Sequence, residues 1–114
     1  MYAIGLIDWE YAGPVDPLVE LARVCWLFLK GCLPPLDARA RQLRLLVDAY
    51  GLPSNQRRLL YDLILEVVVR ETAEEAIEAH ITPNRQGPLW GLAWRSRSAA
   101  WILRHRAVLQ RALT

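Results

Sequence analysis

Proline and glycine divide the chain into a short opening strand and four helix-length segments, and this division limits the fold more than any other feature. Proline lacks an amide N–H and glycine favours turns, so a regular helix rarely continues through such positions. The segments between the breaks are long enough for helices of about four to eight turns. The breaks fall at Gly13-Pro14, Gly31 with Pro34-Pro35, Gly51 with Pro53, and Gly87-Pro88.

Residues 2–8 are predicted to form one short buried strand. Tyr2, Ile4, Leu6 and Asp8 share one face, the opposite face is apolar as well, and Asp8 is a polar residue at the carboxyl end. A lone strand is unstable, and no second strand is evident in the sequence. We therefore expect a mainly α chain with one short N-terminal strand, an α+β fragment of a larger lobe. It forms a single partial domain over residues 1–114, with the strand and its loop in 1–15 and four helices in 16–114.

The first helix begins with Asp16 as N-cap and Pro17 in its first turn, and ends near Gly31. Trp26 and Phe28 widen its apolar stripe until the helix is apolar nearly all round, which predicts a central position in the fold. The stripe consists of residues three and four apart, namely Leu18, Leu21, Ala22, Cys25 and Leu29.

Three further helices follow, over about residues 37–50, 54–81 and 88–113, with a loop over 82–88. Asp37 is the expected cap of the second helix, and Gly51 stands where a left-handed C-cap would be. Apolar spacing predicts the inner faces. They are Leu43, Leu46, Val47 and Tyr50; Leu59, Leu60, Leu63, Ile64, Val67, Val68, Ala73, Ala76 and Ile77; and Trp90, Trp94, Trp101 and Val108.

Charge is arranged in blocks, although the net charge is only +2. Residues 1–22 and 62–84 are acidic, whereas 23–61 and 85–114 are basic. We expect the blocks to pair with one another or to face water, and we do not expect nucleic-acid binding. The acidic strip of Glu71, Glu74, Glu75 and Glu78 is interpreted as a solvated helix face.

Composition indicates a folded, cytoplasmic protein. Apolar residues make up 54% of the chain, which excludes a disordered tail. Cys25 and Cys32 lack a metal-type spacing and are expected to be free thiols in a reducing compartment. No signal peptide is recognisable, and the longest apolar run, residues 24–29, is too short to span a membrane.

The most informative segment begins at the end of the strand. A carboxylate at a strand terminus, followed by an aromatic residue and a Gly-Pro loop, can hold a hard cation such as Mg²⁺. Asp8 would be the ligand, and Glu10 could add a second carboxylate. On spacing alone, the simpler interpretation is that both side chains leave the strand for solvent.

The string Leu6-Ile7-Asp8-Trp9-Glu10-Tyr11-Ala12-Gly13-Pro14, continued by Asp16-Pro17 and Glu20-Leu21-Ala22, resembles the metal-binding segment of the aminoglycoside phosphotransferase family. That family is similar to protein kinases in fold, so the resemblance implies the helical C-terminal portion of a kinase-like fold. It implies ATP-dependent phosphorylation of a small hydroxylated or aminoglycoside-like molecule, with Asp8 binding the Mg²⁺ that bridges the nucleotide phosphates. Asp16 would cap the first helix, and Glu20 stands where the family usually has Asp.

The chain also departs from that family. A His-x-Asp-x-x-x-x-Asn catalytic loop should precede the metal ligand, yet no His, Asp or Asn precedes Asp8. The nucleotide lobe is also missing, so we expect the chain alone to be inactive. The alternative is a non-catalytic helical interaction module that forms a homodimer or docks on another chain, such as a missing N-terminal lobe.

Overall fold

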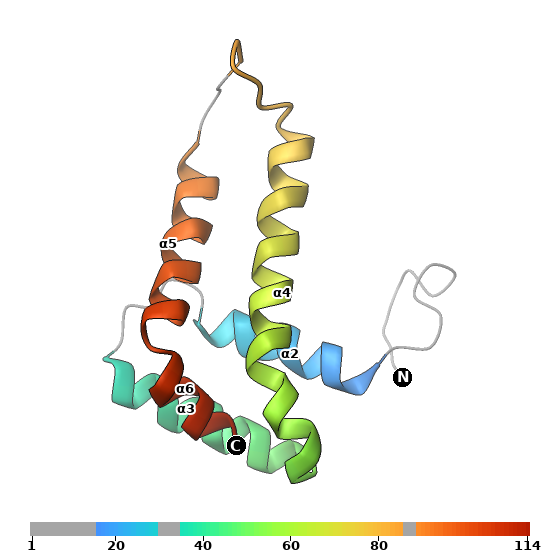
Figure 1. Cartoon of the computed structure of the whole chain (residues 1–114), viewed down its shortest axis with the longest axis vertical. Coiled ribbons are helices and arrows are strands. Elements are labelled where there is room, and N and C mark those ends of the chain that lie inside the picture. The colour runs from blue at the N-terminus through green and yellow to red at the C-terminus, as the bar shows by residue number, and fades with distance from the viewer. Residues whose placement is uncertain (1–15, 30–34, 86–88) are drawn as a thin grey trace.

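The computed structural model describes residues 16–29, 35–85 and 89–114, and within these ranges it forms five helices (Figure 1). The prediction of a mainly α chain is confirmed for this part. The predicted strand and its loop, residues 1–15, lie outside the described residues, as does Cys32. The helices are α2 (Pro17–Leu29), α3 (Leu36–Tyr50), α4 (Ser54–Glu78), α5 (Trp90–Arg104) and α6 (Arg106–Leu113).

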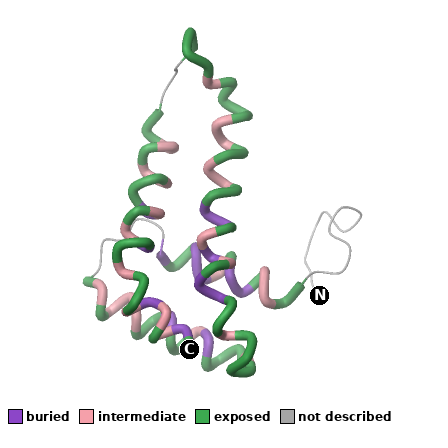
Figure 2. The backbone as a smooth tube through the Cα atoms, viewed as in Figure 1, coloured by how far each residue is buried: buried purple, intermediate pink, exposed green. Residues whose placement is uncertain are grey.

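The core lies at one end of an elongated molecule that measures 47 × 38 × 21 Å. There α4 packs against α2 and α6, and α3 packs against α2 and α6. The end of α4 and the start of α5 extend from the core as a two-helix arm, which we define as residues 69–85 and 89–97 (Figures 1 and 2). The largest fully buried side chains are Trp26, Tyr61, Leu21, Leu29, Leu43, Leu60, Ile64, Ile102, Leu109 and Leu113.

Local chemistry sets several helix ends. The Oδ1 atom of Asp16 accepts a hydrogen bond of 2.9 Å from the N–H of Leu18, and so caps α2. Gly51 ends α3 with φ 68°, in the left-handed region that glycine adopts without strain. Asp37 is not the cap of α3, because the helix already begins at Leu36. The carbonyl of Pro35 accepts the first helical bond, which places Asp37 within the first turn.

Helix α4 ends at Glu78, three residues before the predicted end. His80 has φ 54°, and the N–H of Ile81 reaches back 3.4 Å to the carbonyl of Ala76. This pattern closes a helix through a left-handed residue. Thr82 and Arg85 then exchange two backbone hydrogen bonds, so the chain reverses around Pro83-Asn84 toward α5.

The last predicted helix is two helices, separated at His105. The hydroxyl of Tyr61 donates a hydrogen bond of 2.8 Å to the carbonyl of Ile102, which in an unbroken helix would accept from the N–H of Arg106. A side chain that bonds into the helical ladder is a recognised cause of a break. The guanidinium of Arg106 lies over the Tyr61 ring, 4.8 Å from its centre.

Some predicted inner faces are wrong. Tyr50, Leu59 and Ile77 are exposed, and Trp90 is 78% exposed. Trp90 begins α5 in the arm, beyond the reach of the core. The buried side chains of α5 are Ser98 and Ile102, and Ala99 and Trp101 pack against the core while partly exposed. Helix α2 is also not covered all round, since Leu27 and Phe28 remain exposed.

Candidate functional site

A groove of about 330 Å³ lies between α2 and α4, and we call it the α2–α4 groove. Two side chains of α2, spaced one helical turn apart, line the groove. Four side chains of α4 line it as well, at spacings of three and four residues, so each helix presents one face to the groove. Its lining residues are Arg23, Leu27, Val67, Arg70, Glu71 and Glu74.

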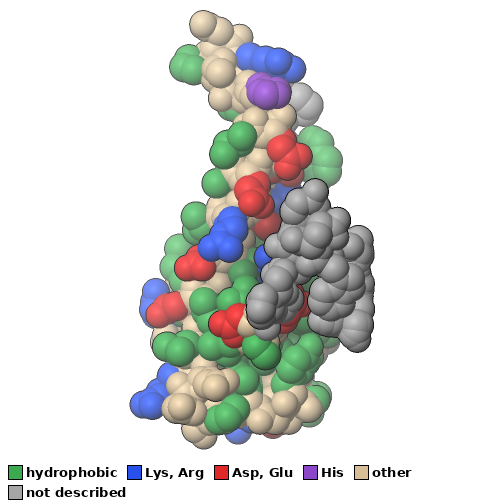
Figure 3. All heavy atoms as spheres, turned by 90° about the vertical axis from the view of Figure 1, so that its right-hand side faces the viewer, with side chains coloured by type: hydrophobic (Ala, Val, Ile, Leu, Met, Phe, Trp, Pro, Cys, Tyr) green, Lys and Arg blue, Asp and Glu red, His purple; other side chains and the backbone are tan. Residues whose placement is uncertain are grey.

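The groove has an apolar floor and a charged rim. Val67 is buried, whereas Leu27 is 62% exposed and so offers apolar surface to a ligand. Arg70 pairs with Glu66 at 3.1 Å, outside the groove lining. Glu74 makes no ion pair with any described residue, which leaves one carboxylate free at the rim. Figure 3 shows acidic, basic and apolar side chains interspersed along this region of the surface.

One end of the groove is fixed by Arg95 of α5. Its Nη1 atom lies 2.5 Å from Oε1 of Glu75, and its Nε atom lies 3.7 Å from Oε1 of Glu71. The Arg95 side chain is only 20% exposed, and its guanidinium also lies over the Trp94 ring, 5.7 Å from the ring centre. The pairing orients Glu71, so α5 helps to shape the groove without lining it.

Of the four residues predicted from the sequence to form a site, only Asp16 and Glu20 lie within the described part of the chain. Asp8 and Glu10 lie outside the described residues, so their binding of Mg²⁺ with ATP stays a prediction. Asp16 caps α2. Glu20 is exposed and lies 4.0 Å from Arg23, one turn before the groove. In the described ranges, no group of three His, Cys, Asp or Glu side chains could hold a metal ion.

The acidic strip is only partly a solvated face. Glu71 and Glu75 are half-buried against Arg95, whereas Glu74 and Glu78 are exposed. The expectation that charge blocks pair with one another is therefore confirmed between the acidic segment 62–84 and the basic segment 85–114. Asp62 and Arg106 add a weaker contact of 4.0 Å between the same blocks.

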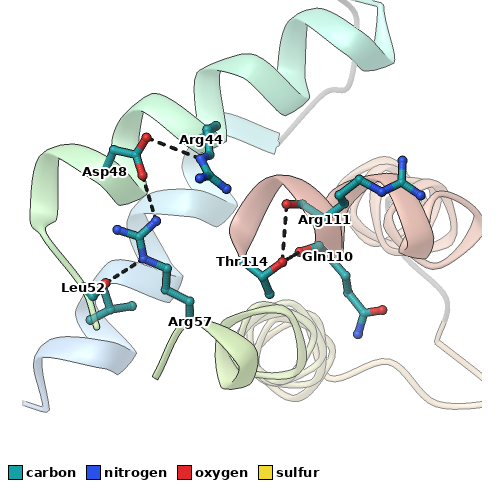
Figure 4. Close-up of polar contacts among 7 residues, drawn as sticks. All are labelled: Arg44, Asp48, Leu52, Arg57, Gln110, Arg111 and Thr114. Atoms are coloured by element: carbon teal, nitrogen blue, oxygen red, sulfur yellow. Dashed lines mark hydrogen bonds and ion pairs between the residues drawn. The ribbon is translucent and has the colours of Figure 1, made fainter. Parts of the chain in front are cut away.

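A second hollow lies beside the end of α6, and its lining includes Arg57, Arg58 and Arg111. Arg57 turns toward α3, where it donates to Asp48 at 2.7 Å and to the carbonyl of Leu52 at 2.6 Å. The guanidinium of Arg111 points away from Arg57 (Figure 4). Arg57 thus links the start of α4 to the end of α3, and its charge is paired with that of Asp48.

The cysteine of α2 is not a reactive group. Cys25 is a free, buried cysteine, and burial raises the pKa of its thiol to about 12. Such a thiol is unsuited to nucleophilic chemistry. Among the helices that the structure describes, none has the length and hydropathy to cross a membrane.

Sequence reasoning missed the groove because its two walls come from helices about forty residues apart. Val67 belongs to a stripe predicted to face the core, and Leu27 lies on a helix predicted to be apolar nearly all round. The sequence does carry a signal, because the charged residues Arg23, Arg70 and Glu71 lie three or four residues from Leu27 or Val67. A helix face that includes charged side chains is not wholly buried.

Comparison with known proteins does not support a kinase-like assignment. No protein-family model matches the chain, and no solved structure matches it. A curated protein of Rhizobium leguminosarum bv. trifolii, named trifolitoxin immunity protein, is 46% identical to it over 121 aligned residues. That alignment covers 96% of this chain and 46% of the relative, so the chain spans about half of the relative's length.

The assignment to the aminoglycoside phosphotransferase family, with its kinase-like and transferase function, is therefore wrong. The resemblance depended on about twenty residues around Asp8, whereas the new likeness extends over nearly the whole chain. Over that length, the chain is similar to a protein named for immunity to a toxin.

Proposed function

We propose that this chain acts in immunity to a toxin, and that it does so by binding through the α2–α4 groove. The observation that carries the proposal is the 46% identity to the trifolitoxin immunity protein across 96% of the chain. At this identity, the two sequences share nearly half of their residues over almost the whole length of this chain.

The groove supports binding as the mode of action. An exposed leucine beside a buried valine gives a ligand apolar area to cover, and such area contributes about 25 cal/mol per Å² when it is buried. The unpaired carboxylate of Glu74 can orient a ligand through a cationic or hydrogen-bonding group. A few polar groups around an apolar floor are typical of binding pockets.

A second candidate function, which also depends on binding, is that of a non-catalytic helical module that docks on another chain. It is favoured by the alignment, because the relative is about twice as long as the aligned segment. In that case the groove would receive part of a polypeptide, and immunity would require both chains.

The test is a growth assay in a trifolitoxin-sensitive bacterial strain that expresses this chain. We expect growth at toxin concentrations that arrest the strain carrying an empty vector. Glu74→Lys should reduce this protection at least tenfold in tolerated toxin concentration, because it reverses the one free charge at the groove rim. The matched control is Glu78→Lys, an equal charge change one turn further along α4 and outside the groove.

Two outcomes would contradict the proposal. Absence of protection at an expression level confirmed by immunoblot would count against immunity by this chain. Equal loss with both variants, while circular dichroism shows intact helices, would count against the groove.

A further inference from the structure

The α2–α4 groove and the ion pairs around it carry more negative than positive charge. Two arginines line the groove, and each is matched by a glutamate of its own helix. Arg23 lies 4.0 Å from Glu20 on α2, and Arg70 lies 3.1 Å from Glu66 on α4. Each of these pairs is neutral as a whole, so the charge of the groove is set by its remaining acids.

The remaining acids outnumber the cation that pairs with them. Arg95 makes its nearer contact with Glu75, at 2.5 Å, and lies 3.7 Å from Glu71, which lines the groove. Gly91 of α5 leaves room for the Glu75 carboxylate, because a Cβ atom at this position would lie 2.7 Å from Oε2 of Glu75. Glu74 makes no ion pair with any described residue. The charged lining residues and the ion-pair network around them comprise three arginines and five glutamates, a net charge of −2.

Apolar surface lies beside this excess of negative charge. Leu27 is 62% exposed, and Val67 forms the buried part of the groove floor. Val67, Glu71 and Glu74 follow one another at spacings of four and three residues, so they share one face of α4. A volume of about 330 Å³ is at the lower end of the range for ligand pockets, roughly 300–1,000 Å³, and suits one small molecule. A complementary ligand therefore has an apolar body and a cationic group close together.

We propose that the α2–α4 groove binds a small amphipathic organic cation, with its apolar body on Leu27 and Val67 and its ammonium or guanidinium group beside Glu74 and Glu71. This ligand class rests on the proposed function, which places binding in the same groove. An anion would meet the excess carboxylates, since both lining arginines are already paired. A neutral apolar molecule would remove water from Glu74 without replacing its hydrogen bonds, which is unfavourable.

The probe is n-hexylammonium, which joins a cation to a short apolar chain and stays protonated at neutral pH, as a lysine side chain does. Added to the isotope-labelled full chain, it should shift the backbone amide NMR signals of the groove-lining residues in a saturable manner. The Kd should be of millimolar order, because so small a molecule makes few contacts. Hexanoate carries a negative charge on a similar apolar chain, and methylammonium carries the positive charge without the chain. Each should bind at least tenfold more weakly than n-hexylammonium.

Matched substitutions test both ends of the ligand. Glu74→Gln should raise the Kd of n-hexylammonium about tenfold, because it removes the unpaired carboxylate. Glu78→Gln removes an equal charge one turn further along α4, outside the groove, and should leave the Kd nearly unchanged. Leu27→Ala should also weaken binding several-fold, since it removes apolar surface from the floor. Its control is Leu45→Ala, which changes an exposed leucine of α3, and circular dichroism confirms that all four variants keep their helices.

Three results would overturn this ligand class: no saturable shifts at tens of millimolar n-hexylammonium, hexanoate binding as tightly, or equal effects of Glu74→Gln and Glu78→Gln. The growth assay separates the ligand class from the proposed function. Protection that requires Glu74, without any binding of n-hexylammonium, would overturn the ligand class and leave immunity standing. Saturable binding by a chain that confers no protection would instead support the ligand class and contradict immunity.

Discussion

At the scale of single residues, Cys25 shows how burial controls chemistry. Its thiol is buried in the core, and this burial raises its pKa to about 12. At pH 8 only about one such thiol in ten thousand is ionised, and the thiolate is the reactive form. In a Cys32→Ser background, we expect a thiol reagent to label Cys25 only as fast as the protein unfolds.

The control for this prediction lies two residues along the same helix. Leu27→Cys, in a chain lacking both native cysteines, places a thiol at a position that is largely exposed and should be labelled within the mixing time of the reagent. Rapid labelling of Cys25 in folded protein, with unfolding measured separately in urea, would show that the α2–α4 contact opens readily.

Asp48 offers a second prediction at this scale. The hydrogen bond from Arg57, with a smaller contribution from Arg44, lowers the pKa of the Asp48 carboxyl below its usual 3.8. A lowered pKa in the folded state adds stability above the unfolded pKa, and this stability is lost as pH falls through the folded value. Asp48→Asn should therefore be less stable than the parent at pH 7, and the difference should shrink as the pH falls below 3.8 and vanish once the Asp48 carboxyl is protonated in the folded protein.

Urea unfolding at a series of pH values checks this expectation. Asp37→Asn removes the more exposed carboxylate of the same helix and controls for the loss of one acidic charge. A difference between Asp48→Asn and the parent that persists unchanged to pH 2 would rule out the Arg57 contact as its source.

At the scale of elements, the break between α5 and α6 depends on one hydroxyl group. Burial raises the pKa of Tyr61, so its phenol stays protonated and donates to the carbonyl of Ile102 at neutral pH. Tyr61→Phe removes this donor and should destabilise the fold by about 1 kcal/mol. Urea unfolding measures the change, and Tyr50→Phe, on an exposed tyrosine, should be neutral.

Hydrogen exchange at the break gives an independent reading. Without the phenol, the carbonyl of Ile102 can accept from the N–H of Arg106, so that amide should become more protected as α5 and α6 join. A Tyr61→Phe variant as stable as the parent, with unchanged exchange at Arg106, would mean that the break has another cause.

A helix end can be predicted from the sequence when the residue that causes it lies close by in the chain. Asp16-Pro17 and Gly51 act on backbone within a few residues, so helix ends at these points are readable from the sequence. The break at His105 cannot be predicted in this way, because the Tyr61 hydroxyl that bonds to Ile102 comes from a residue 41 positions before Ile102. The α2–α4 groove escaped for the same reason, as Leu27 and Val67 meet only after α2 and α4 pack. The sequence predicted that acidic and basic segments pair, but it did not identify Arg95 as the residue that pairs with Glu71 and Glu75.

At the scale of the whole molecule, the arm and the core are held by different forces. The core buries leucine, isoleucine, valine and tryptophan, whereas the described residues of the arm include none that is buried. Within the arm, Arg95 of α5 forms ion pairs with Glu71 and Glu75 of α4. We expect the two parts to differ in local stability, since regions with few buried contacts open at lower free energy than the core.

The Arg95→Met variant tests whether the ion pairs of Arg95 stabilise the arm separately from the core. The substitution keeps the length and apolar contacts of the stem but leaves two carboxylates, four residues apart, without their cation, which should cost the arm about 1–2 kcal/mol. Amides at residues 72–78 and 92–97 should then exchange about tenfold faster, while amides at 60–64 in the core change little. Arg97→Met, an exposed arginine two positions along α5, removes an equal charge and should leave both rates as they are. Uniform acceleration of arm and core would instead mean that the whole chain unfolds as one unit, and that Arg95 stabilises the entire fold rather than the groove wall it supports.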